Sequence, residues 1–357
     1  MEVNKLWETA LSLDNNRDIE NIFLKGRLSR NLVQTLKEFL KEVDYPLAIR
    51  SSSLLEDSQY QPLAGMYATY MLPNSHKDSK ERLSQVCEAI KRVYASTFFE
   101  DPKTLMENIV HRHEEEKMAV IIMEMVGKTH DDYFYPTFSG VAQSYNYYPI
   151  SYMKREEGVI FTAVGLGKTI VDGEKSLRFS PKHPEIFPQY YSTKSTINNS
   201  QNNFYALDME KGMSPIKYGE TKNLKKYDLS IAESNGQLKF SASVITKDNI
   251  IRDSLNYSGI RVITFANILK FQKFPLVKIL NYLLEIGEKS LGCPVELEFA
   301  VNIDEHKKIK EFCLLQIKPM VIGTARKDVD ISLYKNHKSL NLTPKHNIKI
   351  RILSRLN

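Results

Sequence analysis

Two stretches near the end of the chain, CPVELEFAV at 293–301 and FCLLQIKP at 312–319, set both the fold and the expected site of chemistry. In the first stretch the apolar residues alternate with Glu296 and Glu298, which is typical of a β-strand with one face in a core. The two glutamates would therefore lie on the opposite face, roughly 7 Å apart. This pattern places two carboxylates side by side on one strand.

The second stretch predicts a partner strand on which Gln316 and Lys318 share one face. If the two strands pair, the sheet presents two carboxylates, an amide and an ammonium together. Magnesium commonly takes one or two carboxylates plus phosphate oxygens, and a lysine beside them would neutralise phosphate charge. The stretches therefore suggest a floor for magnesium and a nucleotide, although an exposed strand face with ordinary polar residues also accounts for them.

Apolar residues recur with helical spacing in three other segments. They predict helices over 276–291, shortly before the strand pair, and over 30–43 and 80–97 in the N-terminal third. In 80–97 the charged side chains fall largely outside the apolar stripe, as in a helix that covers a core. Asn31 is a possible N-cap of the 30–43 helix.

Strand patterns lie between these helices. PLAIRSSS at 46–53 predicts a strand that runs into a turn, and EEEKMAVIIMEMVG at 114–127 predicts a buried strand that enters a glycine turn. From about residue 130 aromatic and β-branched stretches alternate with turns, so a sheet-rich unit is expected. The polar segment 192–203 predicts a surface loop, and the tyrosines within 145–152 predict a sheet face.

Length and composition limit the class of protein. With 357 residues, the chain is long enough for two or three domains of about 150 residues. No apolar run approaches the roughly 20 residues of a membrane-spanning helix, and the N-terminus lacks a signal-peptide pattern. Three cysteines without a CxxC pair disfavour a disulfide scaffold and a cysteine zinc site. A cytoplasmic protein without membrane partners is expected.

The net charge of +6 is concentrated in the tail 324–357, which contains eight lysines and arginines and two aspartates. A basic tail could bind nucleic acid or another anionic partner, and it is also typical of a solvated terminus. The charge is confined to the tail and is not interleaved with aromatic residues. A nucleic-acid partner is therefore not expected.

RSSSLLED at 50–57 allows two interpretations. Ser53 and Glu56 fit the S-x-x-E capping box, which marks the start of a helix. The N-terminus of such a helix can also bind anions through free backbone N–H groups, and Arg50 just before it could bind a phosphate.

GLGKTIVDG at 165–173 resembles a phosphate-binding P-loop only superficially. The P-loop pattern requires a glycine at 162, where this chain has Thr162, and the strand–loop–helix context is missing. Gly165 and Gly167 either let the backbone approach a phosphate or form a tight turn.

In chain order, these pieces resemble the N-terminal ATP-binding domain of the phosphoenolpyruvate synthase and pyruvate phosphate dikinase family. The resemblance covers residues 46–320 and rests on five blocks in the family's order. These blocks are LAIRSSSLLEDSQYQPLAGMYATYML (47–72), EAIKRVYASTF (88–98), EEEKMAVIIMEMVG with FSGVA (114–142), GLGKTIVDG (165–173) and CPVELEFAV with FCLLQIKP (293–319).

The resemblance implies an α+β, ATP-grasp-like fold of two subdomains that clamp Mg·ATP. We expect a first subdomain at 1–128, a sheet-rich second subdomain at 129–323 and the basic tail at 324–357. In complete family members this domain phosphorylates a histidine on a swivelling domain, and the phosphohistidine then phosphorylates pyruvate on a C-terminal barrel. Those partners would lie in another chain or in a C-terminal part outside this sequence.

The resemblance also implies residue roles. Arg50 and Lys318 are the candidate catalytic residues, because they match positions that contact ATP phosphates. The remaining candidates are Glu296, Glu298 and Gln316 for magnesium, with Glu296 and Gln316 also at the nucleotide; Gly165 and Gly167 near the nucleotide; and Glu124 to Val126 along adenine, largely through their backbone.

Four positions depart from the family pattern. Glu296 replaces an aspartate, Lys318 an arginine, Met123 a common glutamine and Lys168 a glutamate. The family's GGKG lysine loop has no clear counterpart, and none of the eight histidines lies in a TGG-x-x-SH context. The expected function is an ATP-dependent phosphotransferase module that lacks its own acceptor. The alternative is a catalytically degenerate nucleotide-binding or regulatory module, or an inactive fragment.

Overall fold

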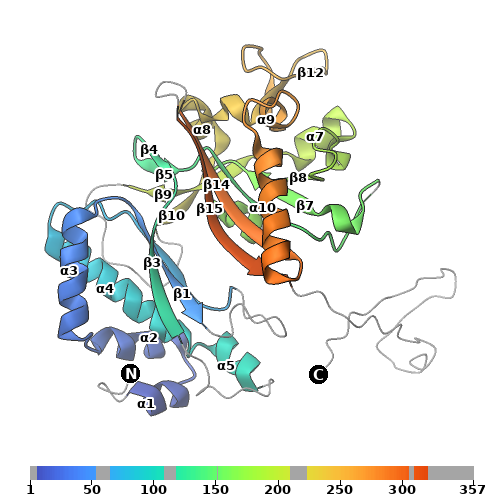
Figure 1. The fold of residues 1–357 in the computed structure, drawn as a ribbon. Helices are drawn as coiled ribbons and strands as arrows, with labels where there is room; N and C mark the ends of the chain where they lie inside the picture. Colours follow the sequence, from blue (N-terminus) through green and yellow to red (C-terminus); the bar gives the residue numbers. More distant parts are fainter. Residues whose placement is uncertain are drawn as a thin grey trace, which may run out of the picture.

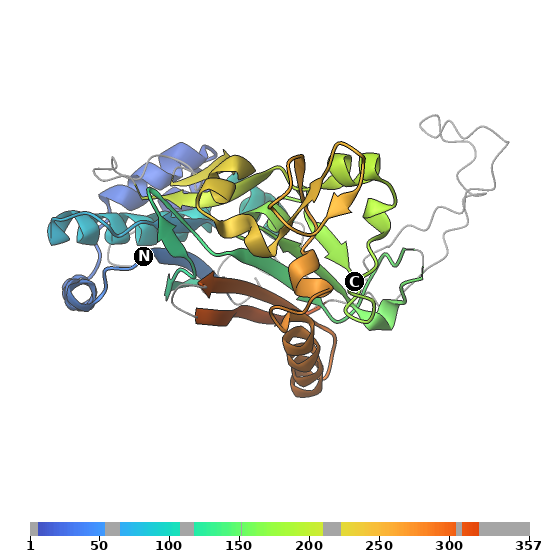
Figure 2. The same ribbon diagram turned by 90° about the horizontal axis from the view of Figure 1, so that it is seen from above.

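The computed structural model describes residues 6–53, 65–107, 118–150, 152–209, 223–304 and 309–320. Helices and small antiparallel sheets form an α+β fold (Figure 1). The N-terminal helices and strands gather at one end of the molecule and the remaining sheets at the other, as the view from above also shows (Figure 2). The tail 324–357 lies outside these ranges. Within them, no helix has the length and apolar character needed to cross a membrane.

The N-terminal part places helices beside a three-stranded sheet. Its strands, in the order β2-β1-β3, are β1 (Leu47–Ser53), β2 (Thr69–Leu72) and β3 (Met118–Glu124), and all neighbours are antiparallel. Its helices are α1 (Leu6–Ser12), α2 (Asn16–Lys25), α3 (Arg30–Glu42), α4 (Ser79–Ser96) and α5 (Glu100–Glu107). The helices predicted over 30–43 and 80–97 are confirmed.

Helix α3 begins where the sequence supplies both a cap and an apolar stripe. The Ser29 hydroxyl accepts a hydrogen bond from the Leu32 N–H at 3.2 Å, so Ser29 is the N-cap and the predicted cap at Asn31 is wrong. Leu36 and Leu40 follow one turn apart on the buried face and join a cluster with α4 and β1. This cluster is the core of the N-terminal sheet.

Beyond the N-terminal part, the described residues form three further antiparallel sheets, in the orders β15-β14-β6-β7-β8, β10-β9-β5-β4 and β12-β11-β13. The strands are β4 (Lys128–His130), β5 (Tyr133–Tyr135), β6 (Phe138–Gln143), β7 (Val159–Ala163), β8 (Leu177–Phe179), β9 (Asn203–Asp208), β10 (Leu224–Asp228), β11 (Ala242–Ile245), β12 (Ile251–Arg252), β13 (Ile260–Ile263), β14 (Val295–Asp304) and β15 (Ile309–Pro319). The helices are α6 (Lys168–Val171), α7 (Thr193–Asn199), α8 (Leu229–Ser234), α9 (Ala266–Leu269) and α10 (Leu276–Leu291), with 3-10 turns η3 (Arg155–Glu157), η4 (Pro188–Tyr190) and η5 (Gln237–Phe240).

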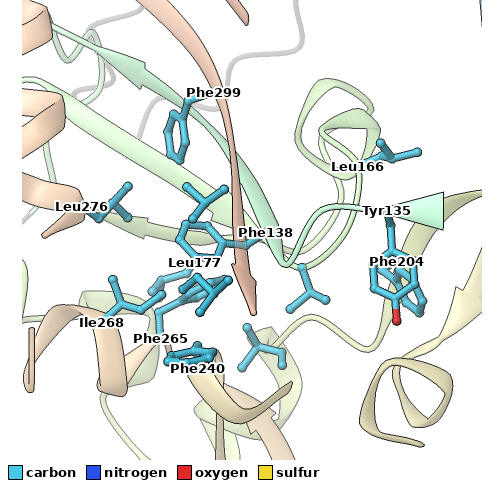
Figure 3. Packing of buried hydrophobic residues seen from close by; sticks show 14 of the residues in the cluster. Tyr135, Phe138, Leu166, Leu177, Phe204, Phe240, Phe265, Ile268, Leu276 and Phe299 are labelled. Atoms are coloured by element: carbon cyan, nitrogen blue, oxygen red, sulfur yellow. The ribbon is translucent and has the colours of Figure 1, made fainter. Parts of the chain in front are cut away.

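The largest hydrophobic core lies against one face of the five-stranded sheet (Figure 3). The Phe138 ring of β6 packs edge to face on Phe265, with centroids 5.4 Å apart. Helix α10, predicted over the same residues, buries Leu276, Leu280 and Leu284 at intervals of four. Because strand side chains alternate, the opposite face of this sheet is left for polar residues.

Three sequence predictions need correction. The segment 192–203 was expected to be a surface loop, yet Ser192 caps the short helix α7 by accepting the Ser195 N–H at 3.1 Å. The tyrosines after β6 lie in a loop instead of a sheet face. Strand β3 is the edge of its sheet and is only half-buried, with Ile121 42% exposed, so the prediction of a buried strand is wrong.

Candidate functional site

Strands β14 and β15 pair in the register that gathers the four predicted polar residues. Glu296 lies opposite Lys318, and Glu298 lies opposite Gln316. The Lys318 Nζ is 2.9 Å from Glu296 Oε1, and these side chains are 23% and 18% exposed, respectively. The residues therefore share one face of the five-stranded sheet, which we call the site face.

Strand β6 adds a residue that the sequence did not single out. Gln143 lies opposite Glu296 on the other side of β14, and its Nε2 donates to Glu296 Oε2 at 2.6 Å. Both oxygens of Glu296 are thus held, one by an ammonium and one by an amide. Only one local signal could have revealed Gln143. It ends the strand pattern FSGVAQ directly after the buried Ala142, so its side chain is expected on the opposite face.

Glu298 differs sharply from its neighbour. It lies between Gln316 of β15 and Val141 of β6 in the register. No side chain in the described part of the chain forms a hydrogen bond or an ion pair with its carboxylate. The site face therefore holds one neutralised carboxylate and one whose charge is available to a ligand.

Arg50 reaches this face from the N-terminal sheet. In β1 the residues Leu47, Ile49 and Ser51 are buried, and the alternation turns Arg50 to the other side. The Arg50 Nη2 donates to Gln316 Oε1 at 3.1 Å, although the two residues are 266 positions apart. The structure thus brings together Arg50 and the polar residues of the β14–β15 pair.

The helix start expected within RSSSLLED stays a prediction. Strand β1 continues through Ser53, and the residues 54–64 that follow it lie outside the described ranges. A capping or anion-binding role for the residues after Arg50 is therefore neither confirmed nor corrected.

The segment expected along adenine, residues 124–126, starts at the end of β3. Glu124 is exposed there and Val126 is half-buried. Burial, followed by the charges of Glu311 and Glu124, raises the pKa of Cys313. Cys313 belongs to the site face, because its partner on β14 is two positions from Glu298. The start of the segment, at Glu124, therefore lies within electrostatic range of β15.

The glycine turn 165–167 packs on the same face of β6. The Ser139 hydroxyl donates to the Gly165 carbonyl at 2.7 Å. Ser139 lies two and four positions before Val141 and Gln143 on β6, so the three residues share one face. Gly165 has a φ of +82°, and a Cβ there would lie 2.7 Å from the Phe204 ring. The fold itself therefore requires a glycine at Gly165, and its expected place near the nucleotide stays a prediction.

Gly167 is in a different situation. Its φ of −60° suits any residue, and the nearest atom to a Cβ at this position would be Ser139 Oγ at 3.8 Å. Neither backbone strain nor crowding by the described residues calls for a glycine here. A glycine that no described residue requires is consistent with close approach of a ligand to the backbone.

Lys168, which reverses the charge of the family pattern, is neutralised locally. Its Nζ lies 2.9 Å from Asp172 Oδ1 and 5.6 Å from the centre of the Tyr205 ring. The Tyr205 hydroxyl donates toward Asp172 Oδ2 at 3.2 Å and toward Glu174 Oε1 at 3.1 Å. Burial and these carboxylates raise the pKa of Tyr205 to about 12. The lysine thus belongs to a network that holds the segment after the glycine turn against β9.

The donor set suits a magnesium ion that is shared with a ligand. The described ranges hold no group of three or more histidine, cysteine or acidic side chains able to bind a metal by themselves. Magnesium keeps several waters and usually takes one or two carboxylates plus substrate phosphates. The unpartnered carboxylate of Glu298 fits that requirement.

Comparison with known proteins agrees with this geometry. The family model of the pyruvate phosphate dikinase AMP/ATP-binding domain matches residues 5–338, which is most of the chain. None of the curated proteins compared with the chain matches it. The match spans both the strand that carries Arg50 and the strand pair that carries the acidic residues. The chain therefore belongs to the family of the pyruvate phosphate dikinase AMP/ATP-binding domain, with its α+β, ATP-grasp-like fold.

Proposed function

We propose that the site face binds Mg·ATP and that the chain transfers a phosphoryl group from it to a histidine on another domain. The observation that carries this proposal is the contact of Arg50 with Gln316, because it brings a guanidinium to the site face beside Glu298. Arg50 also belongs to a different sheet, so a ligand bound here would touch both ends of the fold.

Each candidate residue has a role that its surroundings support. Arg50 and Lys318 would bind phosphate oxygens and offset their negative charge. Glu298, opposite Gln316, would bind magnesium, which when bound shields the charge that builds up on the phosphates. The backbone of Gly167 and of residues 124–126 would approach the nucleotide, the latter along adenine.

Such a site would act by positioning and by charge. Phosphoryl transfer passes through a loose transition state, so the protein contributes little covalent chemistry of its own. Fixed cationic groups that face the transferring phosphate stabilise the charge that develops there. The acceptor histidine would belong to a swivelling domain, and a barrel that binds pyruvate would complete the reaction, in another chain or in a further part of the protein. We also propose that the chain divides into a first subdomain at 1–128 and a second subdomain at 129–323.

Two observations favour a second candidate function. The ammonium of Lys168, beside the glycine turn, is engaged by Asp172, and the pair Glu296–Lys318 already satisfies charges on the site face. A site arranged in this way could hold a nucleotide without turning it over, as in a regulatory module. Formation of ADP or AMP that depends on an added histidine-bearing acceptor domain separates the two functions.

Binding of the nucleotide is tested by isothermal titration of the full chain with Mg·ATP. We expect saturable binding in the micromolar range, about −8 kcal/mol. Glu298→Gln and Arg50→Ala should each weaken it about tenfold or more, with the melting temperature nearly unchanged. Glu285→Gln removes an exposed carboxylate on α10 and serves as the control. A folded wild-type chain that does not bind Mg·ATP, or a Glu298→Gln variant with unchanged affinity, would contradict the proposal.

A further inference from the structure

Two of the residues that depart from the family pattern face one another. Glu296, in place of an aspartate, and Lys318, in place of an arginine, are direct register partners on β14 and β15. Their side chains form an ion pair of 2.9 Å and are about four-fifths buried. One side chain is a methylene longer than the family residue, and the other carries a compact ammonium in place of a planar fork. The two departures therefore meet in a single contact.

Gln143 fixes the carboxylate of this pair from the opposite side. Strand β14 lies between β6 and β15, so Glu296 has Gln143 on one flank and Lys318 on the other. Gln143 Nε2 holds Oε2 at 2.6 Å while the Lys318 ammonium holds Oε1. A lysine side chain loses rotamer entropy when it is held in one place. A carboxylate that is itself immobile gives the ammonium a defined position before any ligand arrives.

The same contacts make Glu296 a poor ligand for a cation. A magnesium ion bound to Glu296 would lie within a few ångströms of the Lys318 ammonium, and two positive charges at that distance repel each other strongly. Glu298 forms no ion pair with a described side chain, and the Arg50 guanidinium on this part of the face donates to the Gln316 amide oxygen opposite Glu298. The charges on the site face thus give the two glutamates different roles.

We infer that Glu296, held by Gln143, is a positioning residue that fixes the Lys318 ammonium toward nucleotide phosphate, whereas Glu298 is the carboxylate that meets the cation. The inference rests on the proposed nucleotide site and assigns Gln143 to it as a further positioning residue. The longer carboxylate and the compact ammonium form one coupled unit in this chain. Changing either member alone disturbs the position of the cationic group, and changing both together restores it.

The test is a double-variant cycle that keeps every charge. ATP affinity is measured by isothermal titration for the wild type, Glu296→Asp, Lys318→Arg and the combined variant. We expect each single change to weaken binding about 5- to 20-fold, and the combined variant to lie within about threefold of the wild type. Gln143→Ala removes the support of the carboxylate without touching the pair. It should weaken binding about as much as Glu296→Asp, and it provides a second variant if Glu296→Asp does not fold.

A second readout separates positioning from metal binding. The ratio of ATP affinities with magnesium and with a chelator should stay within about twofold of the wild-type ratio in Glu296→Asp. In Glu298→Gln the ratio should fall toward one. Additive losses of affinity in the cycle, or loss of the magnesium effect in Glu296→Asp, would overturn this inference. The proposed nucleotide site would still stand in that case, provided that the wild type binds ATP. A folded wild-type chain that binds no ATP overturns both.

Discussion

Gly165 and Gly167 share one turn, but their surroundings predict opposite outcomes on replacement by alanine. Gly165 has a positive φ, and a Cβ would lie 2.7 Å from the Phe204 ring and 2.8 Å from the Tyr205 carbonyl oxygen. We expect Gly165→Ala to lower the free energy of unfolding by about 1–3 kcal/mol. Gly167 has an ordinary φ, and a Cβ there would meet Ser139 Oγ only at an ordinary contact distance of 3.8 Å, so Gly167→Ala should leave stability unchanged. Thermal denaturation of both variants measures the difference.

The same pair of variants probes the ligand. If the Gly167 backbone approaches a nucleotide, the added methyl group weakens Mg·ATP binding in a protein of wild-type stability. Titration of Gly167→Ala with Mg·ATP gives this answer directly. Unchanged affinity would remove Gly167 from the proposed site, and equal melting temperatures of the two variants would contradict the crowding around Gly165.

Single residues differ in how far the sequence could predict them. The four polar residues of the β14–β15 pair could be grouped in advance, because strand alternation alone fixes which side chains share a face. The contact between Arg50 and Gln316 joins two sheets across 266 positions, and no local pattern encodes such a distance. Gln143 was missed because its importance comes from the register of β6 against β14, which is a property of the folded sheet.

At the scale of elements, one buried arginine joins α2 to α4. Arg92, 4% exposed, forms an ion pair with Glu20, 3% exposed, and its Nη2 lies 2.7 Å from Glu88 Oε1. Removing the arginine leaves a buried carboxyl group without its partner, so Arg92→Ala should cost about 3–5 kcal/mol in urea denaturation. Lys41→Ala, which breaks the exposed pair with Glu38, should cost about 0.5 kcal/mol or less and is the control.

The effect of this variant should depend on pH. Burial raises the pKa of Glu20 even with Arg92 beside it, and the loss of the arginine raises it further. An acid with a raised pKa keeps its proton in the folded state where the unfolded chain has lost it. Stability therefore falls as the pH rises above the ordinary carboxyl value. The loss in Arg92→Ala should be greater at about pH 8 than at about pH 5, and a loss that shrinks with rising pH would contradict the assignment.

Elements were predictable where one physical signal dominated. Helix α10 has an apolar stripe through its whole length, and its predicted bounds agree with the structure. Helix α7 was missed because its few residues are polar, and it is defined by the Ser192 cap and by contacts with η4. Strand β3 reads as a buried strand from its apolar run, yet it is an edge strand whose exposed face includes Ile121. The order of strands in the sheet decides that exposure, and no local stretch of sequence predicts it.

At the scale of the whole molecule, a few specific contacts connect the N-terminal sheet to the rest of the fold. Besides the contact of Arg50 with Gln316, Asn223 Nδ2 donates to the Met71 carbonyl of β2 at 2.9 Å. Ala48 of β1 and Met71 of β2 also pack against the larger hydrophobic cluster, but the buried residues of the two clusters are separate sets. A ligand that touches Arg50 and Glu298 at once would therefore add a connection between two parts that share little core.

This arrangement predicts that Mg·ATP stabilises both ends of the molecule together. In hydrogen–deuterium exchange, a saturating concentration of about 100 times the dissociation constant should slow the most protected amides of β1 and β15 by up to about 100-fold, which corresponds to about 2.7 kcal/mol. In Arg50→Ala at an equally saturating concentration, β15 should remain protected, and β1 should lose most of the effect, because its contact with the ligand is gone. Strand β11 lies in a separate sheet and serves as the internal reference. Protection of β15 without β1 in the wild type would mean that the nucleotide lies on the site face alone. The guanidinium of Arg50 would then be a contact between the two sheets and not part of the binding site.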